Sequence, residues 1–490
     1  MAARGVRGGW RRRSSLIAAL LGVLALSIAS SASGDPAPVA DPVLVPLVGG
    51  VPVAVTSGAT PEPGTPSGSA EPSGGESDDD PGVGSPLDPD AVAEALEPLL
   101  SGGALGAGRT PARVIDVATG EVLYDSTDEP TTPASTMKLV TALSALDALG
   151  ADATLSTRTV ILDPDAATPR VAVVGGGDPS LTSSDPSIGG AGTSLPTPSM
   201  RDLAERTAQA LTVRGIQEVR IGYDDSLFTG PALLPSWQDS FPALGVVAPV
   251  SALVVDQGRR TPSATARTAD PASAAAQVFA EELERAGIEV RGSVKQVTGK
   301  ADSVPLAQVR SASVGMLVER MLATSDNDFA EILARLAAGA SGHPASFEGV
   351  SARAADVLEA HGIDSEGARF ADGSGLSRRD ELLPSTLTDL LAVTSSAFGD
   401  VASGLSVAGV NGSLHARYDG SSTEAARGVV RAKTGTLTGV VALAGYASRP
   451  DGRLLAFAVL DDTAPGATLA ARNQVDRAIA ALVSCDCAAG

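Results

Sequence analysis

The chain has 490 residues, which is enough for two or three domains and at least one large core. Its formal net charge is −21, which argues against a nucleic-acid partner, because phosphate binding needs basic patches. The three histidines show no ligand spacing to one another or to the two cysteines. We therefore expect neither a metal site nor a cofactor.

The N-terminus is typical of an export signal. Arginines precede an apolar run at 16–29, and small residues follow at 30–34. We interpret 1–33 as a signal peptide or, if it is not cleaved, as an N-terminal membrane anchor, and expect the protein to be exported. Residues 34–89 are rich in Pro, Gly, Ser and acidic side chains. Such a composition cannot bury enough apolar surface to fold, so we predict a disordered linker.

Folded sequence is expected to begin near Asp90 with a helix. A hairpin follows over 114–124, where two apolar runs flank Ala118-Thr119-Gly120. Apolar residues recur at helical spacing from Pro133 to Leu149. This spacing predicts a helix with Ser135 in its first turn and Lys138 one turn later, on the same face.

The end of the chain mirrors its start, with predicted strands at 440–446 and 454–460 and a last helix over 468–483. We expect one sheet assembled from both ends of the chain. The intervening 152–310 contains a strand at 171–174 and helical patterns near 200–213 and 273–286. We interpret 152–310 as one or two inserted domains, which interrupt a domain made of 90–151 plus 311–484. The fold class is therefore α/β in the broad sense (α+β).

The two cysteines, Cys485 and Cys487, lie almost at the C-terminus. In an exported chain they can form a small disulfide or pair with another molecule. Alternatively, they belong to a frayed tail of little consequence.

Three short motifs occur in a fixed order: Ser135-Thr136-Met137-Lys138, Ser325-Asp326-Asn327 and Lys433-Thr434-Gly435. A serine hydroxyl is a poor nucleophile until a base removes its proton, and no Ser-His-Asp arrangement is credible here. A lysine serves as the base when burial and a neighbouring cation lower its pKa. Lys138 meets both conditions if Lys433 lies beside it.

Each motif alone has an ordinary structural interpretation: Ser135 as a helix cap, Ser325-Asp326-Asn327 as a helix start, and Lys433-Thr434-Gly435 as a turn. All three in this order are a coincidence at roughly one per cent or less, which favours a catalytic interpretation. Ser135 would be the nucleophile, Lys138 the general base and Ser325 the proton relay. Backbone N–H groups of Ser135 and Thr436 would form the oxyanion hole. The substrate would be bound by Asn327, Lys433, Thr434, Gly435 and Thr436.

With these motifs, residues 91–483 resemble the penicillin-binding D-alanyl-D-alanine carboxypeptidase/endopeptidase family, the class C low-molecular-mass penicillin-binding proteins. The four further stretches that carry the resemblance are Gly175–Leu181, Tyr223–Phe228, Asp372–Arg378 and Gly409–Leu414. It implies a penicillin-binding/serine β-lactamase-like αβα domain with an antiparallel sheet, and a long insertion between the first two motifs.

The resemblance also implies an acyl-serine mechanism on peptidoglycan stem peptides, at the outer face of the cytoplasmic membrane or in the cell wall. Ser135 would attack the carbonyl between two D-alanines, or between D-alanine and a cross-linking diamino acid. β-Lactam antibiotics would acylate the same serine. The implied side-chain pocket of the substrate is formed by Leu376, Arg378, Leu437 and Thr438.

Two alternatives remain open at this point. A serine β-lactamase shares the three motifs, but class A enzymes carry a Glu-x-x-Leu-Asn pattern after the second one. Neither Asn411 nor Asn473 follows a leucine, and the insertion is too large for that family. The other alternative is a catalytically weak binding or scaffold protein of the cell wall. The intact motifs argue against it, because decayed sites usually lose a catalytic residue.

Overall fold

The computed structural model describes residues 86–102, 104–105, 110–126, 129–183, 195–261, 263–298, 303–462 and 468–489. The predicted signal and most of the predicted linker lie outside these residues. Within the described ranges, no helix has the length and apolar character needed to cross a membrane.

The first sheet joins the two ends of the folded chain. Its six strands lie in the order β2-β1-β12-β11-β10-β9, and every pair is antiparallel. The predicted N-terminal hairpin pairs directly with the predicted C-terminal one through β1 and β12. The strands are β1 (Ala112–Asp116), β2 (Val122–Asp125), β9 (Ser406–Val407), β10 (Val430–Leu437), β11 (Val440–Ser448) and β12 (Leu454–Asp461).

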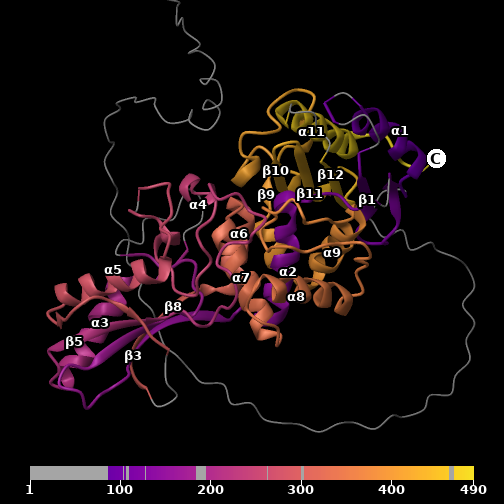
Figure 1. Ribbon diagram of the computed structural model, residues 1–490. Coiled ribbons are helices and arrows are strands. Elements are labelled where there is room, and N and C mark those ends of the chain that lie inside the picture. Colours follow the sequence, from indigo (N-terminus) through magenta and orange to yellow (C-terminus); the bar gives the residue numbers. More distant parts are fainter. Residues whose placement is uncertain are drawn as a thin grey trace, which may run out of the picture. The chain divides into compact units, whose positions relative to one another are not determined.

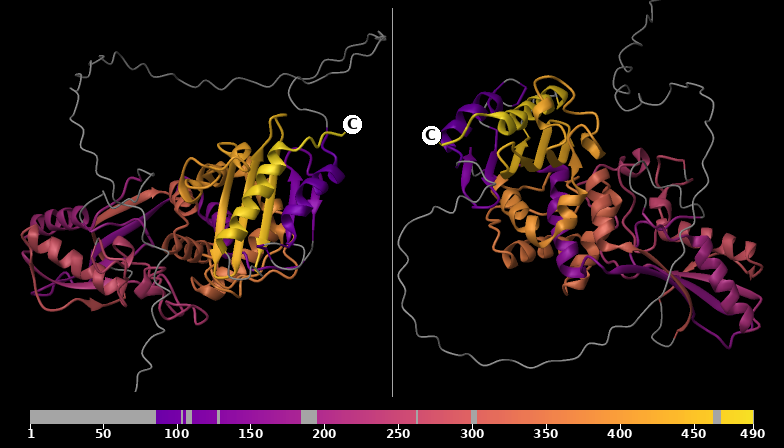
Figure 2. Two further views of the ribbon diagram at one scale, coloured as in Figure 1. Left: turned by 90° about the horizontal axis from the view of Figure 1, so that it is seen from above. Right: turned by 180° about the vertical axis from the view of Figure 1, so that it is seen from behind.

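Successive apolar side chains of the central strands point to opposite faces of this sheet, and both faces are buried. In β11, Leu443 belongs to one hydrophobic cluster, whereas Ala442 and Ala444 belong to the other. Successive side chains of a strand point to opposite faces, so a strand that is apolar throughout needs cover on both sides. The fold is accordingly three-layered, with helices on each side of the sheet, and the predicted αβα architecture is confirmed (Figures 1 and 2).

The helices divide between the two faces. One face is covered by α1 (Pro89–Leu100) and α11 (Thr468–Ser484), which pack against each other. Figure 2 shows α11 lying along the sheet. The other face and its cluster are formed by α2 (Lys138–Leu149), α6 (Val314–Thr324), α7 (Asn327–Ala340), α8 (Phe347–Ala360), α9 (Pro384–Ala397) and the short α10 (Gly399–Gly404).

Between α2 and α6 the chain forms a second, mixed sheet of order β6-β5-β4-β3-β8. The chain enters this sheet through β3 and leaves it through β8. These two strands pair with each other, with Thr154 opposite Ser313. α3 and α5 pack against it through a separate hydrophobic cluster. The elements are β3 (Thr154–Ile161), β4 (Arg170–Val174), α3 (Met200–Val213), β5 (Glu218–Asp224), α4 (Phe241–Leu244), α5 (Pro271–Arg285), β6 (Glu289–Val290), β7 (Lys295–Gln296) and β8 (Val304–Ser313).

The first and last described residues lie side by side. Leu87 and Ala488 form an antiparallel bridge, and the N–H of Asp88 donates to the carbonyl oxygen of Cys487 over 2.8 Å. Cys485 and Cys487 form a disulfide, the first of the arrangements considered above. Figure 1 shows this C-terminal end next to α1.

Candidate active site

Ser135 lies in a sharp turn before α2. The sequence predicted one continuous helix from Pro133, but the structure has a 3₁₀ helix, Ala134–Met137, followed by α2 from Lys138. Ala134 has φ +47°, a left-handed conformation that costs a non-glycine residue energy. Such strain is often found at functional sites. The turn leaves Ser135 half-buried while its neighbours Ala134 and Thr136 are buried.

The amine of Lys138 is buried among three oxygen atoms. Its Nζ lies 3.1 Å from Ser135 Oγ, 2.7 Å from Asn327 Oδ1 and 2.7 Å from the carbonyl oxygen of Ser374. Burial strips water from the ammonium and lowers the pKa of Lys138 from 10.5 to about 8, although nearby acids, above all Asp372, raise it. This lysine is therefore able to accept a proton near neutral pH.

Ser325 and Asn327 are positioned by the junction between α6 and α7. Ser325 ends α6 in the left-handed conformation, with φ +55°. The carboxylate of Asp326 caps α7 and accepts from the N–H groups of Asp328 and Phe329. Asn327 then starts the helix with its side chain facing Lys138. Its Nδ2 donates to the carbonyl oxygen of Val246 over 2.9 Å, which fixes the orientation of the amide.

Lys433 brings the third motif to the same place from β10. Its Nζ donates to Ser325 Oγ over 2.9 Å and to the carbonyl oxygen of Thr434 over 2.8 Å. Burial, and then the proximity of Lys138, hold the pKa of Lys433 well below its ordinary value. The sequence expectation that the two lysines lie close together agrees with this geometry.

The glycine of the third motif allows β10 to approach the serine turn. A Cβ at Gly435 would lie 2.7 Å from the carbonyl oxygen of Pro133 and 3.1 Å from Cβ of Ala134. No larger side chain fits without displacing one of these segments. The edge of β10 beyond Gly435, including the exposed Thr436, therefore lies alongside the turn that carries Ser135.

The other predicted substrate-binding residues make contacts of their own. The hydroxyl of Thr434 donates to Ser413 Oγ over 2.9 Å, and Ser413 belongs to one of the stretches that carried the family resemblance. Arg378 donates to the carbonyl oxygen of Thr438, so the predicted pocket segments meet. Leu376 packs against the cluster around Trp237, and Leu437 is half-buried at the end of β10.

Sequence reasoning missed the acids beneath Lys138. Asp372 and Glu331 are fully buried behind it. Burial, and then the charge of Asp372, raise the pKa of Glu331 to about 8. The Asp372–Arg378 stretch was noted only as a family signature. Nothing in the sequence connected Trp237 to it, although the Trp237 indole donates to Asp372 over 2.7 Å.

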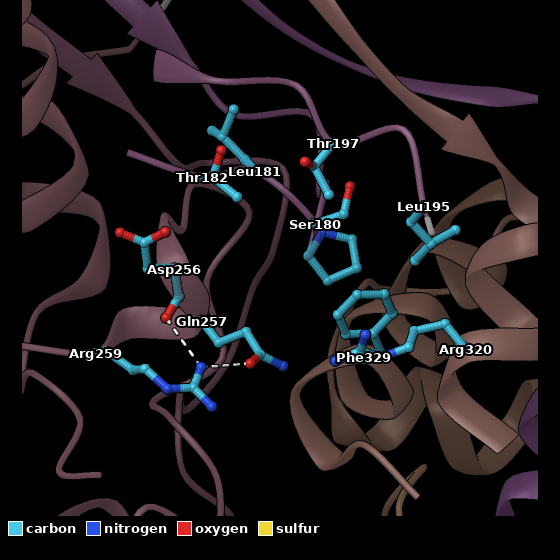
Figure 3. A pocket seen from close by; sticks show the side chains of 11 residues that line it. Ser180, Leu181, Thr182, Leu195, Thr197, Asp256, Gln257, Arg259, Arg320 and Phe329 are labelled. Atoms are coloured by element: carbon cyan, nitrogen blue, oxygen red, sulfur yellow. Dashed lines mark hydrogen bonds between the residues drawn. The ribbon is translucent and has the colours of Figure 1, made fainter. Parts of the chain in front are cut away.

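A separate small cavity of about 40 Å³ lies elsewhere, lined in part by Ser180, Asp256, Arg259 and Phe329 (Figure 3). Arg259 donates there to the side chain of Gln257. No residue of the three motifs lines this cavity, so it is distinct from the site around Ser135.

A serine, two buried lysines, a second serine and an asparagine on an αβα scaffold define the class of penicillin-binding serine hydrolases. A family model described as "D-Ala-D-Ala carboxypeptidase 3 (S13) family" matches residues 92–269 and 260–482. The chain belongs to this family and is a serine-type D-Ala-D-Ala carboxypeptidase.

Individual relatives agree with the assignment. The chain is 34% identical over 395 residues to carboxypeptidase DacB of Mycolicibacterium smegmatis, covering 78% of this chain and 82% of the relative. It is 29% identical to a D-alanyl-D-alanine carboxypeptidase of Actinomadura sp., with 78% and 83% covered. The fold matches penicillin-binding protein 4 of Haemophilus influenzae with a TM-score of 0.65 at 21% identity, covering 80% and 98% of the two chains.

Proposed function

We propose that Ser135 is the nucleophile, Lys138 the general base and Ser325 the proton relay of a D-Ala-D-Ala carboxypeptidase acting on peptidoglycan stem peptides. Ser135 Oγ forms a bond to the carbonyl carbon of the penultimate D-alanine, and its proton moves to Lys138. The C–N bond then breaks, and the leaving D-alanine amine takes a proton through Ser325. Water hydrolyses the acyl-serine and regenerates the enzyme.

The observation that carries this proposal is the set of oxygens around Lys138 Nζ. A neutral amine has two N–H donors and one lone pair. The carbonyl oxygens of Asn327 and Ser374 lie at 2.7 Å and accept the two N–H groups. The lone pair is then left for Ser135 Oγ, at 3.1 Å. The lone pair of Lys138 then faces the serine hydroxyl, as it must in a general base that accepts the serine proton.

The substrate contacts follow from the edge of β10. The N–H groups of Ser135 and Thr436 form the oxyanion hole, which the close approach of Gly435 to the serine turn supports. Asn327 orients the substrate amide. Lys433 and Thr434, with Thr436, bind the terminal carboxylate, because an amine and neighbouring hydroxyl groups all donate hydrogen bonds to that group.

The balance between carboxypeptidase and endopeptidase action depends on the side-chain pocket. We assign Leu376, Arg378, Leu437 and Thr438 to it, and the bond from Arg378 to Thr438 supports a pocket that spans both segments. In the endopeptidase reaction, a cross-linking diamino acid takes the place of the leaving D-alanine, and the same bonds form and break.

The protein is exported, and it acts in the cell wall at the outer face of the cytoplasmic membrane. Its chain divides into a hydrolase domain, 90–151 plus 311–484, and an inserted domain, 152–310. The second sheet, which starts and ends on the paired strands β3 and β8, supports this division. β-Lactams acylate Ser135 because their strained amide takes the place of the scissile peptide bond.

The test is mass spectrometry of the purified protein after incubation with benzylpenicillin, with Ser135→Ala as the control. We expect one adduct on the peptide that contains Ser135, absent from the control, and release of D-alanine from a synthetic stem peptide. Rapid penicillin hydrolysis without an adduct would indicate a β-lactamase instead. Neither adduct nor turnover would overturn the proposed mechanism and leave a scaffold role.

A further inference from the structure

One short segment, residues 237–246, bonds to Asn327, an acceptor of Lys138, and to Asp372, which holds the loop of the other acceptor. Val246 accepts from Nδ2 of Asn327 through its carbonyl oxygen, and Trp237 donates through its indole Nε1 to Oδ2 of Asp372. Asn327 supplies one of the two carbonyl oxygens bonded to Lys138, and the loop that contains Asp372 supplies the other. The segment 237–246 therefore touches the supports of the base on two sides.

Asp372 organises the loop that holds the second acceptor. Its Oδ1 accepts from the backbone N–H groups of Ser374 and Gly375 over 3.0 and 2.6 Å, and its Oδ2 accepts from Ser377 over 2.7 Å. These bonds fix the carbonyl group of Ser374, which accepts from Lys138. Trp237 supplies a further donor to Oδ2, at 2.7 Å.

The indole is itself held rigidly. Trp237 is 7% exposed and meets the ring of Phe347 edge to face, with the centroids 5.3 Å apart and the planes at 83°. Arg335 lies over the other ring, with its guanidinium carbon 4.5 Å from the centroid of Phe347. Packing thus sets the direction of the indole N–H before it meets the carboxylate.

We infer that Trp237 is a positioning residue for the general base: its indole N–H holds the Asp372 carboxylate, and through it the Ser374 carbonyl group, in the place that orients the amine of Lys138. This inference rests on the proposed role of Lys138. Asp372 is fully buried, and the hydrogen bond from Trp237 also reduces the negative charge that its carboxylate presents to Lys138. The charged and titratable groups that act on Lys138 are Asp372, Glu331, Asp326, Asp380 and Lys433.

The experiment compares acylation by benzylpenicillin across pH for the wild type and Trp237→Phe. The phenyl ring keeps apolar bulk but has no N–H. We expect acylation of Ser135 to slow by about tenfold, because a displaced Ser374 carbonyl group misdirects the lone pair of Lys138. The rising limb of the pH profile should also move to higher pH. With one hydrogen-bond donor fewer, the Asp372 carboxylate exerts more of its negative charge on Lys138 and raises the pKa of that amine.

A second variant carries β-(3-benzothienyl)alanine at position 237, which keeps the shape of the indole but replaces N–H with sulfur. Tyr446→Phe is the matched control, because the Tyr446 hydroxyl is another buried aromatic donor and bonds the carbonyl oxygen of Leu391 over 2.6 Å. We expect the thienyl variant to reproduce the slower, shifted profile and the control to keep the wild-type profile.

An unchanged rate and an unchanged limb in both Trp237 variants would overturn the inference while leaving the proposed function intact. An equal loss in Tyr446→Phe would overturn it as well, because the effect would then reflect general loosening. A wild type that forms no adduct on Ser135 would refute the proposed function itself, and the role of Trp237 with it.

Discussion

Acylation of Ser135 should follow the ionisation of Lys138, and the structure determines where on the pH scale this occurs. Burial lowers the pKa of Lys138 from 10.5 to about 8. A shift of this size corresponds to about 3 kcal/mol against the charged form. At pH 7 about one-tenth of the lysine is neutral, roughly 300 times more than for a lysine in water. Only the neutral amine accepts the serine proton.

The acylation rate should therefore rise by about tenfold per pH unit at acidic pH and level off above about pH 8. Rapid quench-flow mixing with benzylpenicillin, followed by mass spectrometry of the adduct, measures this step without any contribution from deacylation. Ser135→Ala supplies the baseline. A rate that keeps rising to about pH 10, as for a solvated lysine, or a flat profile, would refute the reasoning.

Three substitutions test the surroundings of this base. Glu331 has a pKa of about 8, so its carboxyl group ionises over the same pH range as Lys138, and its charge raises the pKa of that amine. Glu331→Gln should therefore move the upper end of the limb, near pH 8, to lower pH, and an unmoved limb would count against that coupling. Gly375→Ala places a Cβ 1.8 Å from the carbonyl oxygen of Ala134 at φ +76°. Urea unfolding should show a loss of about 2 kcal/mol or more, with Gly420→Ala, whose Cβ meets nothing closer than 3.8 Å, as the near-neutral control. Ser325→Ala removes the proposed relay, so adduct formation should slow on the order of a hundredfold, and a wild-type rate would exclude Ser325 from acylation.

Local patterns predicted much of the fold. The strands at 440–446 and 454–460 are continuous apolar runs on either side of a turn, and apolar residues recur at helical spacing in the helix at 200–213. The structure contains all three as β11, β12 and α3. The helix from Pro133 was predicted too simply. Its apolar spacing continues through Ala134, but the left-handed backbone there depends on segments distant in sequence, Gly375 and Gly435, that pack against this turn.

The part of the site that could be predicted is the part whose reacting side chains belong to short sequence motifs. Lys138 and Lys433 were found because serine chemistry needs such neighbours at recognisable spacing. The carbonyl groups of Ser374 and Val246 were not, because every residue has one and only the fold selects which of them meets a lysine or an asparagine. The same holds for Trp237, which lies 135 residues before its partner Asp372.

The bridge between Leu87 and Ala488 brings the first and last described residues of the chain to one point. A protein joined directly before residue 86 or directly after residue 489 would emerge from the same spot, so both fusions should leave the same surfaces accessible. Residues 86 and 489 should also tolerate being linked covalently, with the chain reopened at an exposed turn such as Arg214–Gly215. The adjacency of residues 86 and 489 thus makes the described part of this enzyme suited to circular permutation and to attachment on a surface from either side of the bridge.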